Sequence, residues 1–174
     1  MLRFSSSAQK REQGFTLLEV LLGIAIAAFV FAALTGLLVL LLQSRERNAV
    51  VAEVEQQGEY ALALVLQEAR NADAFLLPVS GQTATSLSVD VEDASLDPLR
   101  FYVEEGVLKM QEGTGDSVAL TNDRVTVSSL SVRNLAADSS PGTVRVSFEL
   151  EYVSSSDVQS YAYTSTFAGS ATLR

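Results

Sequence analysis

The sequence predicts an α+β protein in which one long amino-terminal helix packs on a carboxy-terminal head of antiparallel β-structure. An apolar stretch near the amino terminus is long enough for a membrane helix, and a mixture of apolar and charged residues with helical spacing follows it. After Pro78 the chain changes to short alternating segments rich in Ser, Thr, Val and Asp, which are typical of strands and turns. A chain of 174 residues has room for one modest domain besides the membrane segment.

The apolar stretch has the length and composition of a transmembrane helix. No residue from Val20 to Leu42 is charged, and these 23 residues would span a hydrocarbon core of about 30 Å. Arg3, Lys10 and Arg11 precede the stretch, so the positive-inside tendency predicts a cytoplasmic amino terminus and an exported remainder. A secretory signal peptide is the alternative, but its apolar region is typically about 7–15 residues long and ends at a cleavage site.

The helix is expected to continue beyond the membrane as an amphipathic segment, residues 43–76. Apolar residues recur there three or four positions apart with charged residues between them, and no proline interrupts them. We expect the helix to reach about Phe75, because the dipeptide Leu77-Pro78 would stop it.

Residues 77–174 are expected to form a β-rich head outside the cytoplasm. The clearest strand is Thr143–Val153, in which apolar and polar side chains alternate strictly. Residues 99–110 are typical of a hairpin that turns at Glu104-Glu105-Gly106, where glycine supplies a positive φ. We expect one antiparallel sheet whose apolar face is covered by the outer half of the helix. Further strands are predicted at Thr85–Val91, at 125–132 with a bulge, and at 160–168 with Tyr161, Tyr163 and Phe167 on one face.

One carboxylate, Glu19, lies at the start of the apolar stretch. An unpaired acid about one turn into a membrane helix costs on the order of 2–4 kcal/mol, so it needs a partner unless it sits in the headgroup layer. A cut between Gly14 and Phe15 would create an α-amino group close to Glu19, either in the same chain or in a neighbouring chain shifted by one axial step. In the second arrangement each subunit would bury an acid that only another subunit neutralises.

The stretch KREQGFTLLEVLLGIAIAAF resembles the class III signal of type IV pilins and pseudopilins. The resemblance implies that residues 1–14 are a leader, that prepilin peptidase cuts after Gly14, and that the same enzyme N-methylates Phe15. It further implies that the Phe15 amine and Glu19 form the assembly pair, and that residues 15–42 are the transmembrane and assembly helix. A glycine before the scissile bond lets the peptidase approach the backbone closely.

Many major pilins carry a helix-kinking proline in this apolar segment, and the present chain has none there. Gly36 could replace it as a point of local helix melting inside a fibre, because glycine weakens a helix by roughly 1 kcal/mol relative to alanine. Close helix packing at Gly36 is the alternative interpretation. The stretch LTNDRVTVSSLSVRNL and the terminal FAGSATLR are similar to the carboxy-terminal layout of minor pilins and J-type minor pseudopilins.

The composition excludes several classes of function. The formal charge is −9 and no basic stripe follows the first eleven residues, so no direct nucleic-acid binding is expected. The chain has no cysteine and no histidine, which removes most nucleophile–base pairs and transition-metal sites. We therefore expect neither an enzyme nor a cofactor. The acidic residues of DVEDASLDP form a solvated turn in the favoured interpretation and a calcium site in the alternative: Asp90, Glu92, Asp93 and Asp97.

We therefore predict a structural subunit of a type IV pilus-like filament, a minor pilin or pseudopilin. Its expected partners are other pilin or pseudopilin subunits, prepilin peptidase, the inner-membrane assembly platform and the lipid bilayer. It would be a single-pass precursor in the cytoplasmic membrane, and later part of a surface or periplasmic filament. The alternatives are a subunit of a type II secretion pseudopilus or competence pilus, and a monomeric membrane-anchored surface binding module.

Overall fold

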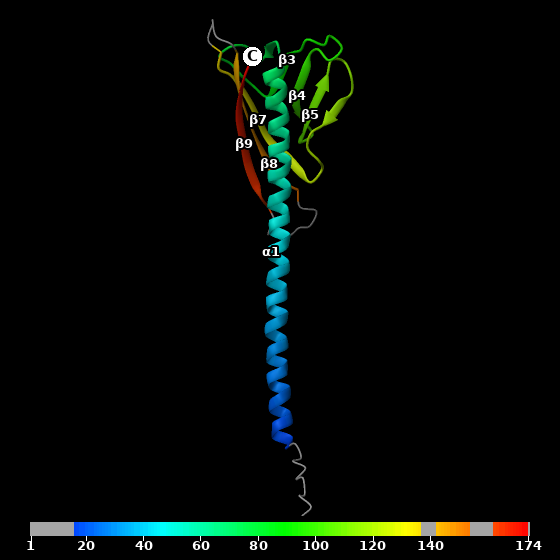
Figure 1. The fold of residues 1–174 in the computed structure, drawn as a ribbon, viewed down its shortest axis with the longest axis vertical. Helices are drawn as coiled ribbons and strands as arrows, with labels where there is room; N and C mark the ends of the chain where they lie inside the picture. The colour runs from blue at the N-terminus through cyan, green and yellow to red at the C-terminus, as the bar shows by residue number, and fades with distance from the viewer. Residues whose placement is uncertain (1–15, 137–141, 154–161, 174) are drawn as a thin grey trace, which may run out of the picture. The chain divides into compact units, whose positions relative to one another are not determined.

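The computed structural model describes residues 16–136, 142–153 and 162–173 of the chain. The chain divides into two compact units, Met1–Arg45 and Glu46–Arg174. One helix, α1 (Leu17–Asn71), runs through the boundary between them (Figure 1).

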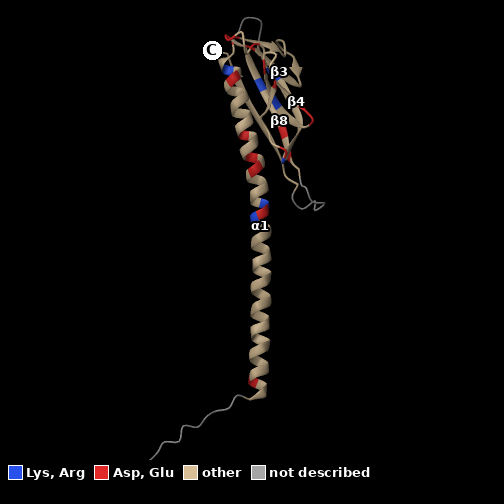
Figure 2. Ribbon diagram, turned by 90° about the vertical axis from the view of Figure 1, so that its right-hand side faces the viewer, with Lys and Arg blue, Asp and Glu red and all other residues tan. Residues whose placement is uncertain are grey.

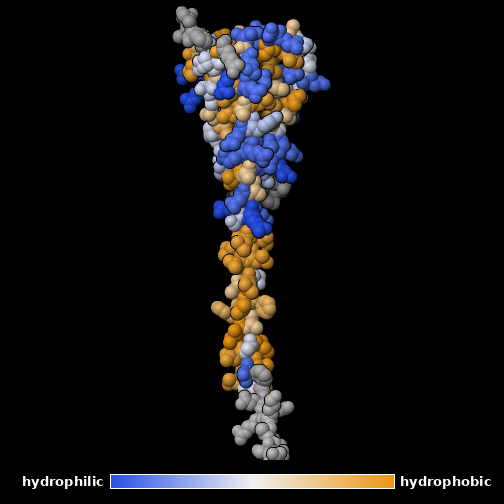
Figure 3. Space-filling view, viewed as in Figure 1, coloured by the Kyte–Doolittle hydropathy of each residue, from blue (hydrophilic) through white to orange (hydrophobic). Residues whose placement is uncertain are grey.

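The first unit contains the apolar part of α1, and its described side chains are all exposed. Figure 3 shows hydrophobic side chains on this part of the helix. The helix is long and apolar enough to cross a membrane, and none of the side chains in its most apolar stretch is buried. A helix in water rarely exposes large apolar side chains on all sides. The surface of this unit is therefore typical of a helix that contacts lipid or other helices.

The second unit begins with the amphipathic part of α1. Its buried positions recur three or four residues apart, except for one adjacent pair, as one face of a helix requires: Val50, Val54, Gly58, Ala61, Val65, Leu66 and Ala69. This part of the helix therefore has one face inside the head and the other in solvent.

The predicted end of the helix is wrong. The helix stops at Asn71 instead of near Phe75, and Ala74–Leu77 form strand β1. The Asp73 amide donates to the carbonyl of Asp90 (2.9 Å), and Phe75 pairs with Val89. The chain therefore leaves the helix and begins to pair with β3 before it reaches Pro78, the residue that was expected to end the helix.

Within the described residues the head contains two antiparallel sheets, where the sequence predicted one. The first sheet has the strand order β1-β3-β4-β5-β6 and the second β2-β7-β8-β9. Besides β1, the first sheet contains β3 (Ser86–Asp90), β4 (Leu99–Glu104), β5 (Val107–Glu112) and β6 (Ser117–Ala119). The second sheet contains β2 (Thr83–Ala84), β7 (Val125–Asn134), β8 (Thr143–Tyr152) and β9 (Thr164–Thr172).

Several predicted strands are confirmed. The β4–β5 hairpin turns where expected, with positive φ at Glu105 (53°) and Gly106 (77°). The bulge falls in β7, between Val127 and Ser129. The last strand lies later than predicted, and Tyr161, one of its three predicted inward residues, is outside the described residues.

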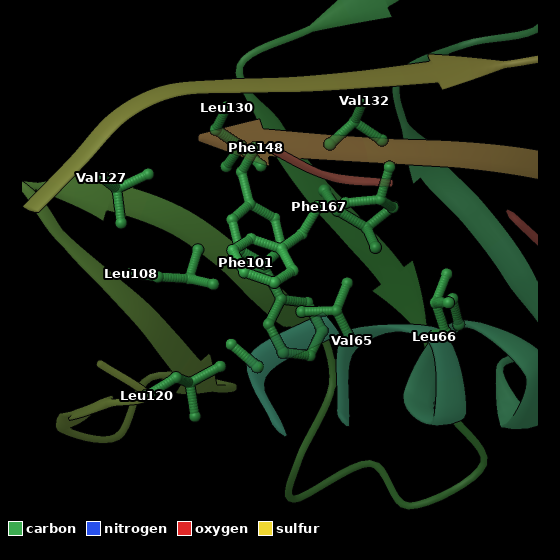
Figure 4. Packing of buried hydrophobic residues seen from close by; sticks show 14 of the residues in the cluster. Val65, Leu66, Phe101, Leu108, Leu120, Val127, Leu130, Val132, Phe148 and Phe167 are labelled. Carbon is green, nitrogen blue, oxygen red and sulfur yellow. The ribbon is translucent and has the colours of Figure 1, made fainter. Parts of the chain in front are cut away.

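The core of the second unit lies where α1 and the two sheets meet. Helix residues Val65 and Leu66 belong to the same buried cluster as Phe101 of β4 and Phe148 of β8 (Figure 4). The Phe148 and Phe167 rings stack with their centroids 5.6 Å apart. The predicted packing of the outer half of the helix on the β-structure is confirmed, since helix side chains complete a core that neither sheet closes alone.

Two glycines bring α1 close to β9. A side-chain carbon on Gly58 of the helix would overlap the ring of Phe167, and one on Gly169 of the strand would overlap Leu66. Each element thus supplies a glycine opposite a large residue of the other, which allows close backbone approach.

Candidate functional site

The first turn of α1 presents Glu19 at the start of the apolar helix. Thr16 precedes the helix and caps it, because the Glu19 amide donates to Thr16 Oγ1 (3.3 Å) and to the Thr16 carbonyl (3.0 Å). The spacing Thr-x-x-Glu is that of a capping box, in which the first residue satisfies an amide that the helix leaves free. A carboxylate in the first turn is also favoured by the helix dipole.

The described residues around Glu19 are apolar and offer it no counter-charge. Figure 2 shows an acidic position, in red, in the first turn of the helix and then a long uncharged stretch of ribbon. Glu19 is exposed, and among the described residues no Lys or Arg forms an ion pair with it. A carboxylate in this position can therefore accept a cation from outside the described part of the chain, and a second polypeptide could supply it.

The other predicted residues of this region are placed only in part. Gly14 and Phe15 lie outside the described residues, so their roles in cleavage, methylation and assembly stay predictions. Gly36 lies inside the continuous helix, and a side-chain carbon there would meet no atom within 4 Å. Local melting at Gly36 also stays a prediction. Thr16 was not predicted as a helix cap, although the Thr-x-x-Glu spacing indicates one.

The acidic residues considered for calcium do not converge. Asp93 Oδ1 accepts hydrogen bonds from the Ser95 amide (2.9 Å) and hydroxyl (2.6 Å), and Glu92 is exposed. Asp90 instead lies beside Asp97. Within the described residues, no group of three or more acidic side chains is arranged to hold a metal ion. Asp93 thus has a local role in the loop that follows β3, and calcium binding at these residues stays the alternative prediction.

Two glutamates of α1 hold the helix to the head, and the sequence had not indicated them. Glu55 Oε1 accepts hydrogen bonds from the Tyr163 hydroxyl (2.7 Å) and the Ser165 hydroxyl (2.9 Å). Glu53 Oε1 accepts one from Asn122 Nδ2 (2.7 Å). No local pattern marks these residues, because their partners lie 69 to 110 positions away along the chain.

A model of the prokaryotic N-terminal methylation motif matches residues 9–35. The chain carries this motif, the class III signal of type IV pilins and pseudopilins. The match includes Gly14, Phe15, Thr16 and Glu19 and ends one residue before Gly36. No curated protein and no solved structure matches the chain significantly.

The motif and the fold agree with each other. The methylation motif lies at the start of a long helix, and this helix packs on antiparallel sheets. Together they make a pilin-like α+β architecture. The motif supports a precursor of the type IV pilin or pseudopilin kind, and it points to a structural subunit instead of an enzyme. It also implies, in general terms, interaction with other pilin subunits and with prepilin peptidase. An apolar amino-terminal helix with this signal supports anchoring in a membrane.

Proposed function

We propose that this chain is a minor pilin or pseudopilin, a structural subunit that assembles into a type IV pilus-like filament through its amino-terminal helix. The observation that carries the proposal is Glu19, an acid without a described counter-charge at the head of an exposed apolar helix that bears a methylation motif.

The chemistry of assembly follows from this position. Cleavage after Gly14 would give Phe15 a free α-amino group, a cation at the start of the same apolar stretch. Pairing this amine with Glu19 of a neighbouring subunit would remove the cost of an isolated carboxylate in an apolar medium. N-methylation would leave the amine basic and able to pair. The association of helices would bury the apolar side chains that the first unit leaves exposed.

The same features support the path by which the subunit would reach the filament. The precursor would sit in the cytoplasmic membrane with its amino terminus inside and its head outside, where the peptidase removes residues 1–14 on the cytoplasmic face. The inner-membrane assembly platform would then pass the mature subunit into a surface or periplasmic filament. Gly36 could melt locally to let helices adjust their packing in that filament. We expect no cofactor in this process.

The direct test replaces Glu19 and follows assembly. Glu19→Ala should leave the precursor inserted and processed, because neither step needs the carboxylate. It should reduce incorporation into filaments about tenfold or more, since each 1.4 kcal/mol of lost association energy is about a factor of ten. Shearing of surface fibres followed by immunoblotting measures incorporation.

Glu19→Gln provides the matched variant, because it keeps the size of the side chain and removes only the charge. It should assemble as poorly as Glu19→Ala. Normal incorporation of both variants would contradict the proposed pairing. A wild-type chain that stays monomeric in the membrane, with no crosslinks through its apolar helix, would favour the surface binding module instead.

A further inference from the structure

One sheet edge in the head is long and open. The two sheets have four edge strands, and three of them are poor templates for pairing. β2 has two residues, β6 has three, and β1 has four with a register shift between Phe75 and Leu77. The fourth, β9, has nine residues and lies at the end of the order β2-β7-β8-β9 (Figure 1). A long regular edge is a template for another strand unless something blunts it.

The register shows which backbone groups of β9 face outward. At one end of the β8–β9 ladder the Leu173 amide donates to the Gly142 carbonyl (2.9 Å), and at the other end the Tyr152 amide donates to the Tyr163 carbonyl (2.9 Å). Directly opposed pairs in an antiparallel ladder alternate between bonded and non-bonded, so the odd-numbered residues of β9 bond to β8. The even-numbered residues direct their amides and carbonyls away from β8: Thr164, Thr166, Ala168, Ser170 and Thr172.

These five residues leave the edge unprotected. In the part of the chain that the structure describes, their backbone groups make no hydrogen bond outside the β8–β9 ladder. Their side chains are small and exposed, and no charge or proline interrupts β9. Sheet proteins commonly protect an edge with a lysine, a proline or a bulge, and β9 has none of these.

The direction of β9 limits what can pair with it. Ser165 bonds to Glu55, whereas Gly169 lies against Leu66, so the strand runs in the same direction as the helix beside it. Antiparallel pairing of two β9 strands would therefore point two helices in opposite directions. Two copies inserted in one membrane with the same orientation cannot adopt that arrangement, an exclusion that rests on the proposed function.

Charge disfavours the remaining way of pairing two copies. Residues 46–174 carry 19 acidic and 8 basic side chains, a net charge of −11. Parallel pairing of two β9 strands would bring two such units together, and their like charge opposes the contact. A neutral or basic partner would not meet this repulsion.

We propose that the open edge of β9 binds an extended segment of a different pilin-like subunit, with small uncharged or basic side chains, as an added strand of the second sheet. The five outward amides and carbonyls would supply the main-chain hydrogen bonds to the partner strand.

Hydrogen exchange of the mature full-length chain tests the proposal. Amide exchange is compared between the chain in native membranes and filaments and the purified monomeric chain in detergent. The even-numbered amides of β9 should exchange at least about tenfold slower in the native material, since an added strand protects them. Equal exchange in the filaments would overturn the inference and leave the proposed function intact. If the chain stays monomeric in native material and the even-numbered amides of β9 are unprotected there, both the edge pairing and the proposed function are contradicted.

Variants at Ala168 separate edge pairing from folding. Ala168→Pro removes one outward amide without touching the ladder to β8, and edge strands tolerate proline. It should abolish the protection of the even-numbered amides, whereas Ala168→Val should keep it. If the odd-numbered amides of Ala168→Pro also lose protection, this variant is misfolded. Thr166→Lys then replaces it as the variant that blocks the edge.

A single introduced cysteine tests whether a second copy of this chain is the partner, because the chain contains no cysteine of its own. Ala168→Cys should form no disulfide-linked dimer of this chain under mild oxidation. Such a dimer would overturn the choice of a different subunit as the partner.

Discussion

Gly58 of α1 lies directly against the ring of Phe167 in β9, and this contact leaves no room for a side chain. Gly58→Ala should therefore destabilise the head, although alanine is the better helix former. Overpacking of a core costs about 1–3 kcal/mol, and the gain in helix propensity is about 1 kcal/mol. We expect a net loss of up to about 2 kcal/mol in the free energy of unfolding, measured by denaturant titration of the mature chain in detergent.

Gln56→Ala is the control for this substitution, because Gln56 is exposed on the same helix. It should change the free energy of unfolding by no more than about 0.5 kcal/mol. A Gly58→Ala variant as stable as the Gln56→Ala variant would show that the Phe167 ring can move aside at little cost.

The second prediction at the level of single residues concerns the pKa of Asp90 and its effect on stability. Burial raises its pKa, and the charge and hydrogen bond of Asp97 and the charge of Asp73 raise it further. The folded chain therefore binds this proton more tightly than the unfolded chain. The resulting stability is fully present below the ordinary aspartate pKa of about 3.9 and is lost as the pH rises through the raised pKa. Asp90→Asn should thus raise the thermal midpoint at pH 7 relative to the wild type, and the difference should shrink on acidification.

Asp93, in the loop that follows β3, provides the opposite case. Its hydrogen bonds from the Ser95 hydroxyl and amide lower its pKa, so its stabilisation is present at neutral pH and is lost as the pH falls. Asp93→Asn should lower the thermal midpoint at pH 7. Equal shifts of the same sign for the two variants would refute the assigned causes.

At the level of elements, the contact between α1 and the chain at the start of β9 depends on a hydrogen bond from Tyr163, the residue before β9, as well as on packing. The Tyr163 hydroxyl donates to Glu55 Oε1, and this hydrogen bond is the main cause of the raised pKa of Tyr163. A phenol with a raised pKa stabilises the fold below its ordinary pKa of about 10, and the contribution disappears as the pH rises through the raised value. Glu55→Gln should bring the pKa of Tyr163 down towards its ordinary value.

Ultraviolet titration of tyrosinate measures this change, with Tyr163→Phe identifying the signal that belongs to Tyr163. Glu59→Gln is the control, because Glu59 is exposed on the same helix. An unchanged titration in Glu55→Gln would mean that the bond does not set the pKa of the phenol.

The elements also show how far the sequence could predict the fold. Strict alternation located β8, and a glycine at the turn located the β4–β5 hairpin, because both signals are local. The division into two sheets depends on which strands pair, which no local pattern records. Strand β1 was missed for the same reason, since Ala74–Leu77 become a strand only by pairing with β3.

The residues of the candidate site differ in the same respect. The sequence could single out Glu19 because it is the only acid at the start of an apolar stretch, and its pairing with another subunit stays a prediction. Glu55 and the open edge of β9 could not be singled out, because each depends on contacts between residues far apart in the chain.

At the scale of the whole molecule, the two units differ in what they bury. The described residues of the first unit bury no side chain, whereas the second unit holds the whole hydrophobic core. Folding of the head should therefore not depend on the apolar part of α1. This division would allow the head to fold outside the cytoplasm while the helix stays in lipid, before any filament forms.

A fragment of residues 46–174 should accordingly fold as a soluble domain without detergent. It keeps every buried helix position, from Val50 to Ala69, and both glutamates that bond to the head. Its cooperative thermal unfolding, followed by circular dichroism, should resemble that of the head in the mature chain. A shorter fragment, 62–174, lacks Val54 and Ala61, which are fully buried, and should lose several kcal/mol and remain unfolded. If 46–174 also fails to fold in the absence of detergent, the head needs the membrane helix, and the independence of the two units is refuted.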